Sequence, residues 1–151
     1  KYLFEMLILE SFQAGLSWEC VLNKREDFRK AFDNFDVEKI CNYNDGKIQE
    51  LLKNEKIIRN KLKINAAINN SKIFKKIQNE YGTFHNYLKT FTNDVIIYEI
   101  DKTTNKLSDN LSKDLQKNGM KFVGSTIIYS YLQAIGIIYS HDKECFMYKN
   151  N

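Results

Sequence analysis

The sequence predicts an all-α protein that folds as a single helical domain over residues 1–151. Apolar residues recur with a period near 3.6 in nearly every segment, which is typical of amphipathic helices. No segment shows the sustained alternation expected of a strand. Hydrophobic residues make up 43% of the chain and aromatic residues 13%, enough for a packed core. A length of 151 residues suits one domain or two small helical lobes that share a cleft.

The formal net charge of +4 and the isoelectric point near 8.8 permit an anionic partner without requiring one. Cys20, Cys41 and Cys145 are an odd number of cysteines without regular spacing, which favours a reducing compartment over a disulfide framework. Residues 1–6 carry charges within their apolar run and do not resemble a signal peptide. We expect an intracellular protein, in the cytoplasm, nucleoid, nucleus or an organelle. The chain starts without Met inside an expected helix, so we also expect a missing N-terminal segment.

Residues 122–140 carry no charge and have to be considered as a membrane span. The stretch contains glycines, hydroxyl side chains and Gln133, and it follows a lysine-rich helix and a turn. These features favour a helix buried in a protein core, and we expect no membrane span.

The first half of the chain contains a series of expected helices separated by polar residues. Ser17 and Asp36 are expected to cap the helices that follow them, and residues 44–46 are expected to form a turn. The expected helices span about residues 2–12, 18–22, 27–32, 37–41, 48–52 and 57–79.

In the second half, Gly82 ends the long helix and Thr83 opens a helix that reaches Phe91. Residues 93–105 are expected to form a loop, in which residues 95–98 are a short extended piece. Asp109 is expected to cap the next helix. A hairpin of two helices is then expected over residues 111–136.

The turn of this hairpin contains a pattern suited to binding phosphate. Glycines allow a tight turn and a close approach of another backbone, and amides at a helix N-terminus bind anions. Phe122 and Val123 are expected to anchor the turn in the core. Such a hairpin holds a DNA backbone without reading its sequence, although the pattern also fits an ordinary turn that ends a helix at a glycine. The candidate residues for the DNA backbone are Gly119, Lys121, Gly124, Ser125 and Thr126.

Glu10 is an anomaly in the first helix because it falls on the stripe set by Leu3 and Leu7, where a core residue is expected, whereas the polar face of the helix is expected elsewhere. A carboxylate that faces an interior is unfavourable unless it has partners or a task. It can also reach the rim of the core and remain solvated. Trp18, the only tryptophan, is either a core residue or one wall of an aromatic pocket for a planar cation.

Several motifs resemble one known family. Residues 9–18, LESFQAGLSW, resemble the LE-x-x-QAGLSW motif of the DNA-3-methyladenine glycosylase I family. Residues 57–70 resemble its IIR-H-x-x-KI-x-AI-x-NA helix, and residues 111–126 its LSK-x-LK-x-x-GFKFVGTT hairpin. Residues 129–136 continue the same pattern. The matching blocks occur in the same order and cover nearly the whole chain.

The resemblance implies a helix-hairpin-helix DNA glycosylase that flips 3-methyladenine out of double-stranded DNA and hydrolyses its N-glycosidic bond. It implies that Glu10, the candidate catalytic residue, accepts hydrogen bonds from the cationic base. Trp18 would stack on that base, and Leu16 would lie near the gap left in the duplex. No lysine stands out as a Schiff-base nucleophile, so we expect base removal without strand cleavage. We expect the protein to act as a monomer on alkylated DNA.

His141 and Cys145 are four residues apart, a spacing that lets both side chains bind one metal ion. The resemblance implies that they hold half of a structural zinc site, with a Cys and a His in the missing N-terminal segment. The chain departs from the family pattern at three positions. Met120 stands where the family has Phe, Asn60 replaces a His, and Leu62 replaces a Gly.

Three other interpretations are compatible with parts of the sequence. A glycosylase of another helix-hairpin-helix family would use a catalytic Asp, for which Asp142 lies at a suitable distance beyond the hairpin. A non-catalytic DNA-binding module would keep the hairpin, but it would not need Glu10 and Trp18. A purely structural helical domain would leave both the hairpin and Glu10 unexplained.

Overall fold

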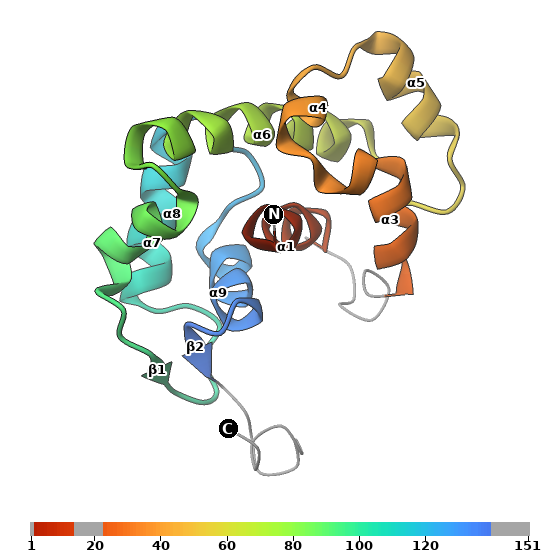
Figure 1. Cartoon of the computed structure of the whole chain (residues 1–151). Helices are drawn as coiled ribbons and strands as arrows, with labels where there is room; N and C mark the ends of the chain where they lie inside the picture. The colour runs from red at the N-terminus through yellow and green to blue at the C-terminus, as the bar shows by residue number, and fades with distance from the viewer. Residues whose placement is uncertain (1, 14–22, 140–151) are drawn as a thin grey trace.

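The computed structural model describes residues 2–13 and 23–139, and it confirms the all-α prediction over these ranges (Figure 1). The first helices are α1 (Tyr2–Gln13), α3 (Arg25–Ala31), the 3-10 turn η1 (Asp33–Phe35), α4 (Val37–Cys41), α5 (Asp45–Lys53) and α6 (Lys61–Tyr81). They are followed by α7 (Phe84–Thr92), β1 (Ile97–Tyr98), α8 (Lys106–Lys117), α9 (Ser125–Ala134) and β2 (Ile138–Tyr139).

Helix α1 lies at the centre of the fold, in contact with α6 and α9 (Figure 1). Every residue from Phe4 to Phe12 is buried, so this helix has no polar face. The sequence analysis placed a polar face elsewhere on this helix, and that interpretation was wrong because neighbouring elements cover the helix on all sides. Phe12 packs against Phe28 and Phe32 of the α3 region, while Phe4 packs on Phe74 of α6.

Side-chain caps determine where several helices begin. Asp36 and Thr83 accept hydrogen bonds from the backbone amides three residues ahead, as predicted. Asn60 caps α6 in the same way, so the long helix begins at Lys61 rather than near residue 57. Asn44 caps α5, and this cap draws residues 45–46 into the first helical turn instead of a separate turn.

The start of α8 also differs from the prediction. Asn105, not Asp109, is the N-cap, and it forms a capping box with Ser108. Asp109 lies in the first turn, where its carboxylate accepts a hydrogen bond from the Ser125 hydroxyl. The short extended piece is confirmed as β1, which pairs in parallel with β2 in the register Ile97 to Ile138.

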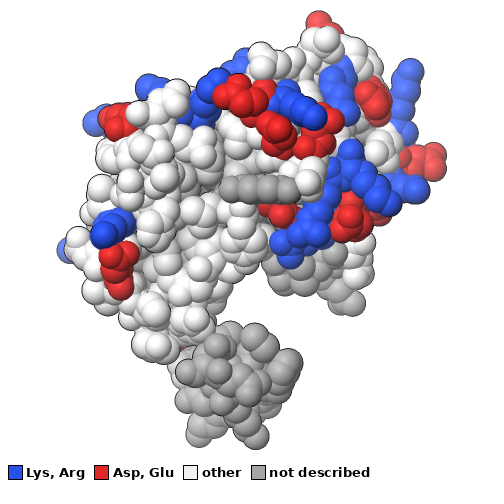
Figure 2. All heavy atoms as spheres, in the orientation of Figure 1, with Lys and Arg blue, Asp and Glu red and all other residues white. Residues whose placement is uncertain are grey.

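The uncharged stretch contains helix α9, which ends at Ala134 and is followed by Gly136 at φ +84° and by β2. Within the described ranges no helix is long and apolar enough to cross a membrane. On the face drawn in Figure 2, positive and negative side chains are interspersed over α3, α4 and α5, while much of the lower part of the described surface is uncharged. The excess positive charge therefore does not mark a single basic patch on this face.

Candidate active site

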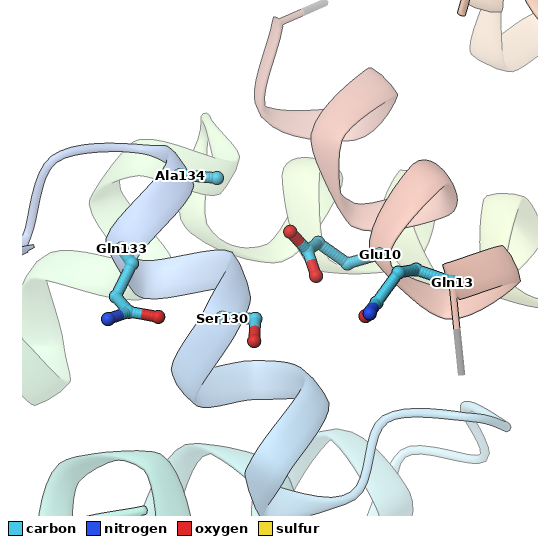
Figure 3. Close-up of a pocket in the computed structure, with 5 residues that line it drawn as sticks. All are labelled: Glu10, Gln13, Ser130, Gln133 and Ala134. Atoms are coloured by element: carbon cyan, nitrogen blue, oxygen red, sulfur yellow. The ribbon is translucent and has the colours of Figure 1, made fainter. Parts of the chain in front are cut away.

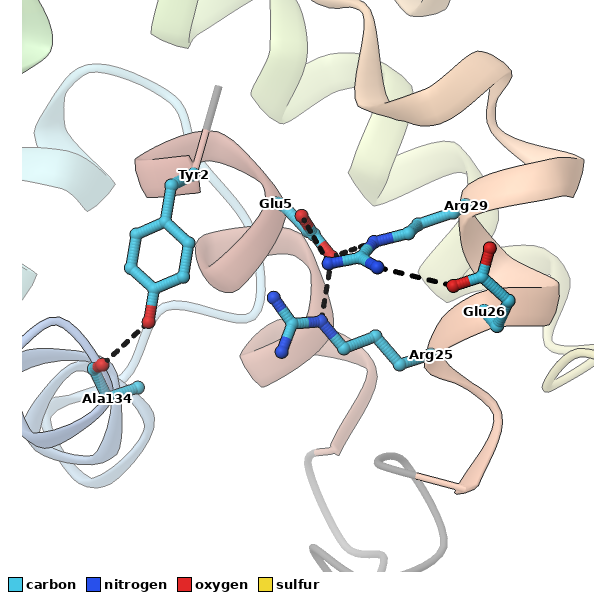
Figure 4. Close-up of polar contacts among 6 residues, drawn as sticks. All are labelled: Tyr2, Glu5, Arg25, Glu26, Arg29 and Ala134. Carbon is cyan, nitrogen blue, oxygen red and sulfur yellow. Dashed lines mark hydrogen bonds and ion pairs between the residues drawn. The ribbon is translucent and has the colours of Figure 1, made fainter.

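Helix α1 carries two buried glutamates, and the first of them is compensated. The Glu5 side chain is 4% exposed and accepts hydrogen bonds of 2.8 Å from Nε of both Arg25 and Arg29 (Figure 4). Burial raises the pKa of Glu5, but the two arginines outweigh burial and bring the pKa below its ordinary value. Glu5 therefore remains ionised and ties α3 to α1.

Glu10 is the second buried glutamate, and no ion pair with a described residue compensates it. The residue is 2% exposed, and its Oε2 atom has no hydrogen-bond partner among the described residues. Burial raises the pKa of Glu10 to about 8 because the charged form loses its hydration. A buried carboxyl oxygen without a partner destabilises the fold, which indicates a functional role for Glu10.

The Glu10 carboxyl group faces a pocket of about 380 Å³ between α1 and α9 (Figure 3). Pockets of this size hold small ligands. The α1 side of the pocket is formed by Glu10 and Gln13, and the α9 side by Ser130, Gln133 and Ala134. Polar groups therefore converge on a space large enough for a planar heterocycle.

Two tyrosine hydroxyl groups fix the spacing between the walls of this pocket. The Tyr2 hydroxyl on α1 donates to the carbonyl of Ala134 at 3.0 Å (Figure 4). The Tyr131 hydroxyl on α9 donates in the opposite direction, to the carbonyl of Leu3 at 2.9 Å. These reciprocal bonds connect α1 and α9 directly, so the pocket walls are held in a defined register.

Helix α6 supports the other end of α1. The Lys63 side chain is buried, and its Nζ atom donates to the carbonyl of Phe12 at 2.9 Å. A cation is favourable at this position because the C-terminal end of a helix carries partial negative charge. Burial lowers the pKa of Lys63 from its ordinary value. Lys63 thus fixes the last turn of α1, close in sequence to Glu10.

The predicted hairpin is confirmed as α8, a tight turn and α9. Met120 and Val123 are buried and anchor the turn. Phe122 is only half-buried and adopts φ +56°, so the prediction that it anchors the turn was wrong. Gly119 adopts φ +104°, a backbone conformation that residues with a Cβ atom rarely take.

The outer side of the hairpin presents groups that suit a phosphate. Lys121 and Thr126 are exposed, and no atom would contact a Cβ added at Gly124. The Ser125 hydroxyl already donates to Asp109. The backbone amides in the first turn of α9 have no intrahelical acceptor and remain available for an anion.

Several predicted site residues lie outside the described ranges. These are Leu16 and Trp18 of the base pocket, His141 and Cys145 of the zinc site, and Asp142 of the alternative glycosylase. Within residues 2–13 and 23–139 no group of three or more His, Cys, Asp and Glu side chains is placed to hold a metal ion. The stacking role and the zinc site therefore remain predictions.

The structure adds three polar pocket residues that the sequence analysis did not propose for the site, namely Gln13, Ser130 and Gln133. Ser130 and Gln133 are polar residues within the uncharged stretch at a spacing of i and i+3, which places them on one face of α9. This spacing was visible in the sequence. Its meaning depends on α9 packing against α1, which periodicity alone does not reveal.

Known proteins of similar sequence and structure are consistent with this site. The chain is 39% identical to DNA-3-methyladenine glycosylase 1 of Escherichia coli (strain K12) over 158 residues, covering 100% of this chain and 84% of that protein. It is 35% identical to DNA-3-methyladenine glycosylase of Haemophilus influenzae over 149 residues, covering 95% and 80% of the two chains.

Solved structures of 3-methyladenine DNA glycosylase I also resemble this chain. The structure of 3-methyladenine DNA glycosylase I from Staphylococcus aureus matches with a TM-score of 0.91 and 33% identity, covering 97% of this chain and 81% of that one. A variant of 3-methyladenine DNA glycosylase I, solved in complex with 3-methyladenine, also matches with a TM-score of 0.91, at 33% identity, covering 97% and 82%.

The helical fold, the hairpin and the pocket at Glu10 together define a helix-hairpin-helix DNA glycosylase. The sequence model of the methyladenine glycosylase family matches residues 1–148. The chain belongs to this family, as the motifs around Glu10 and the hairpin predicted.

The buried carboxyl group predicts a pH-dependent gain in stability for Glu10→Gln. The folded-state pKa of Glu10, about 8, lies above its ordinary value of 4.5. The folded protein therefore holds the Glu10 proton more tightly than the unfolded chain does. The stability that comes from this proton is fully present below pH 4.5 and is lost as the pH rises to about 8. Gln does not ionise. The variant should therefore gain free energy of unfolding relative to the wild type across this interval, by on the order of 4 kcal/mol above pH 8.

Denaturant unfolding of the full-length protein between pH 4 and pH 9 measures this difference. Glu55→Gln, the same change at an exposed position, is the matched control and should show no such trend. A gain at Glu10 that is equal at all pH values would contradict the assignment of a raised pKa.

Proposed function

We propose that this protein is a DNA-3-methyladenine glycosylase, a repair enzyme that hydrolyses the N-glycosidic bond between 3-methyladenine and deoxyribose in DNA. The observation that carries the proposal is the buried carboxyl group of Glu10, whose Oε2 atom has no partner among the described residues, in a pocket of about 380 Å³. The families of the related proteins and the ligand bound in one solved relative support the same substrate.

Charge provides the basis for selecting the damaged base. 3-Methyladenine in DNA is a cation, whereas normal adenine is neutral. Because burial raises the pKa of Glu10 to about 8, the empty site holds mostly the protonated form at neutral pH. A cationic base favours the carboxylate, so Glu10 releases a proton when the base binds. Neutral adenine provides no such compensation for a buried charge.

The bond-breaking step needs little from the protein. The electrons of the glycosidic bond pass to the departing base, which leaves as neutral 3-methyladenine. The sugar becomes positively charged at C1′, and the oxygen of a water molecule adds there and loses a proton. Among the described residues that line the pocket there is no lysine to attack C1′, so we propose base removal without strand cleavage.

The hairpin and the pocket are linked by one helix. The N-terminal turn of α9 contributes amides to the hairpin, and Ser130, about 8 Å further along the helix axis, lines the pocket. Phosphate contacts at the hairpin therefore place an extruded base near Glu10, and they offset an extrusion cost of a few kcal/mol. Because one chain supplies both parts, we propose that it acts as a monomer.

Glu10→Gln should reduce release of 3-methyladenine from methylated DNA and weaken the preference for the cationic base. DNA affinity should stay nearly unchanged, because the hairpin is intact. Chromatography of the released free base, with Glu55→Gln as the matched control, measures the first effect. Equal rates of base release by the two variants would contradict the proposed role of Glu10.

Lys121→Ala should weaken binding to methylated and unmethylated DNA alike, because the side chain is exposed on the hairpin and a contact with a phosphate does not depend on the base. Loss of one phosphate contact should lower the slope of log affinity against log salt by about one unit. Titration of duplex DNA at several salt concentrations checks both effects. Lys53→Ala, an exposed lysine on α5, removes the same charge away from the hairpin. An equal loss in both variants would exclude a specific contact.

We also propose that His141 and Cys145 bind structural zinc. The support is the spacing of the pair and the family resemblance. Elemental analysis of the full-length protein should give about one zinc ion per chain, and Cys145→Ser should reduce this content. A full-length protein that contains no metal would refute the zinc site without affecting the roles of Glu10 and the hairpin.

A further inference from the structure

Asn70 of helix α6 forms a paired contact with the hairpin. Its side chain is fully buried, at 0% exposure. Its Oδ1 atom accepts a hydrogen bond from the Lys121 backbone amide, and its Nδ2 atom donates to the Lys121 carbonyl, both at 2.8 Å. One side-chain amide therefore satisfies both polar groups of a single residue in the turn.

The preceding residue strengthens this contact. Asn69 Nδ2 donates to the carbonyl of Gly119 at 2.8 Å. Two consecutive asparagines of α6 thus make three hydrogen bonds to residues 119–121. Helix α6 belongs to a different part of the chain from the hairpin, so these bonds define the position of the turn relative to the rest of the protein.

The turn needs such support because its backbone is unusual. Gly119 and Phe122, on either side of Met120 and Lys121, both adopt positive φ values. For Phe122 this conformation carries a steric cost. Buried peptide groups must also find hydrogen-bond partners, and Asn70 provides them for Lys121. Without Asn70 the turn would lose its two hydrogen bonds to α6, and the Lys121 amide and carbonyl would lose these partners.

The pairing also determines which groups of the turn remain available for DNA. The amide of Lys121 is used by Asn70, whereas the Lys121 side chain is exposed. We propose that Asn70 is a positioning residue for DNA binding, which holds the hairpin so that Lys121 and the first amides of α9 face the phosphate backbone. This inference depends on the proposed glycosylase function, because it takes the hairpin as the DNA contact.

Few side chains can replace asparagine at this position. Aspartate lacks the donor for the Lys121 carbonyl, and leucine lacks both donor and acceptor. Glutamine has both groups but is longer by one methylene, which a buried site does not readily accommodate. The geometry therefore requires a short primary amide.

Asn70→Ala in the full-length protein tests the proposal. The variant should bind duplex DNA about ten-fold more weakly, because two buried hydrogen bonds are lost. Its dissociation constant for free 3-methyladenine should stay within about two-fold of the wild-type value, since the pocket is formed by α1 and α9. KM for methylated DNA should rise more than kcat falls. A merely structural role would change both ligands' affinities or neither.

Asn79→Ala is the matched control, because Asn79 is exposed and lies on the opposite face of the same helix from Asn70. DNA affinity equal in the two variants would overturn the inference. Asn69→Ala, which loses one hydrogen bond to the hairpin, should give a smaller loss of DNA affinity. This variant tests the inference if Asn70→Ala does not fold. A wild-type protein that released no base and bound no DNA would instead overturn the proposed function.

Discussion

The central constraint on this structure is the burial of α1 by α6, α9 and the aromatic residues of the α3 region. Any charge in the middle of this helix has to be placed in the interior. Glu5 and Glu10 are both buried there, but only Glu5 is matched by arginines. The buried Glu10 carboxyl group therefore lowers the stability of the fold locally. Such a loss is typical of active sites, where a group is held ready for a ligand rather than satisfied by the fold.

The same three helices hold the two halves of the site at a fixed separation. Lys63 and Asn70 are seven residues apart on α6, close to two full turns, so both lie on one face about 10 Å apart along the axis. Lys63 bonds to the end of α1, and Asn70 bonds to the hairpin. Helix α9 makes a second connection, since its first turn belongs to the hairpin and Ser130 lines the pocket. Helices α6 and α9 thus each connect the hairpin, which holds the proposed phosphate contacts, with the region of the base pocket.

Most of the fold, and the anomalous position of Glu10 on the core side of its helix, could be predicted from the sequence, for identifiable reasons. Periodicity and capping residues located most of the helices, and the family motifs identified Glu10 and the hairpin. The cap of α8 was assigned to Asp109 instead of Asn105 because both residue types are good N-caps, and only the hydrogen bonds distinguish them. The roles of Ser130 and Asn70 could not be predicted, since they depend on which helices meet. Glu10 was recognised as anomalous, but its helix was expected to have a polar face, which tertiary contacts remove.

The described residues of the pocket include one carboxyl group and no lysine or arginine, which is consistent with the chemistry of the substrate. Methylation weakens the glycosidic bond and gives the base its charge, so the substrate itself supplies much of the activation. The protein has to distinguish a cation from a neutral purine of nearly the same shape. Steric exclusion discriminates poorly between such ligands, whereas a buried carboxylate without its own counterion gains a partner only from the cation. The absence of an arginine beside Glu10 in the described structure is then as important as the presence of two beside Glu5. An internal counterion would stabilise the fold and, by the same interaction, remove the selectivity.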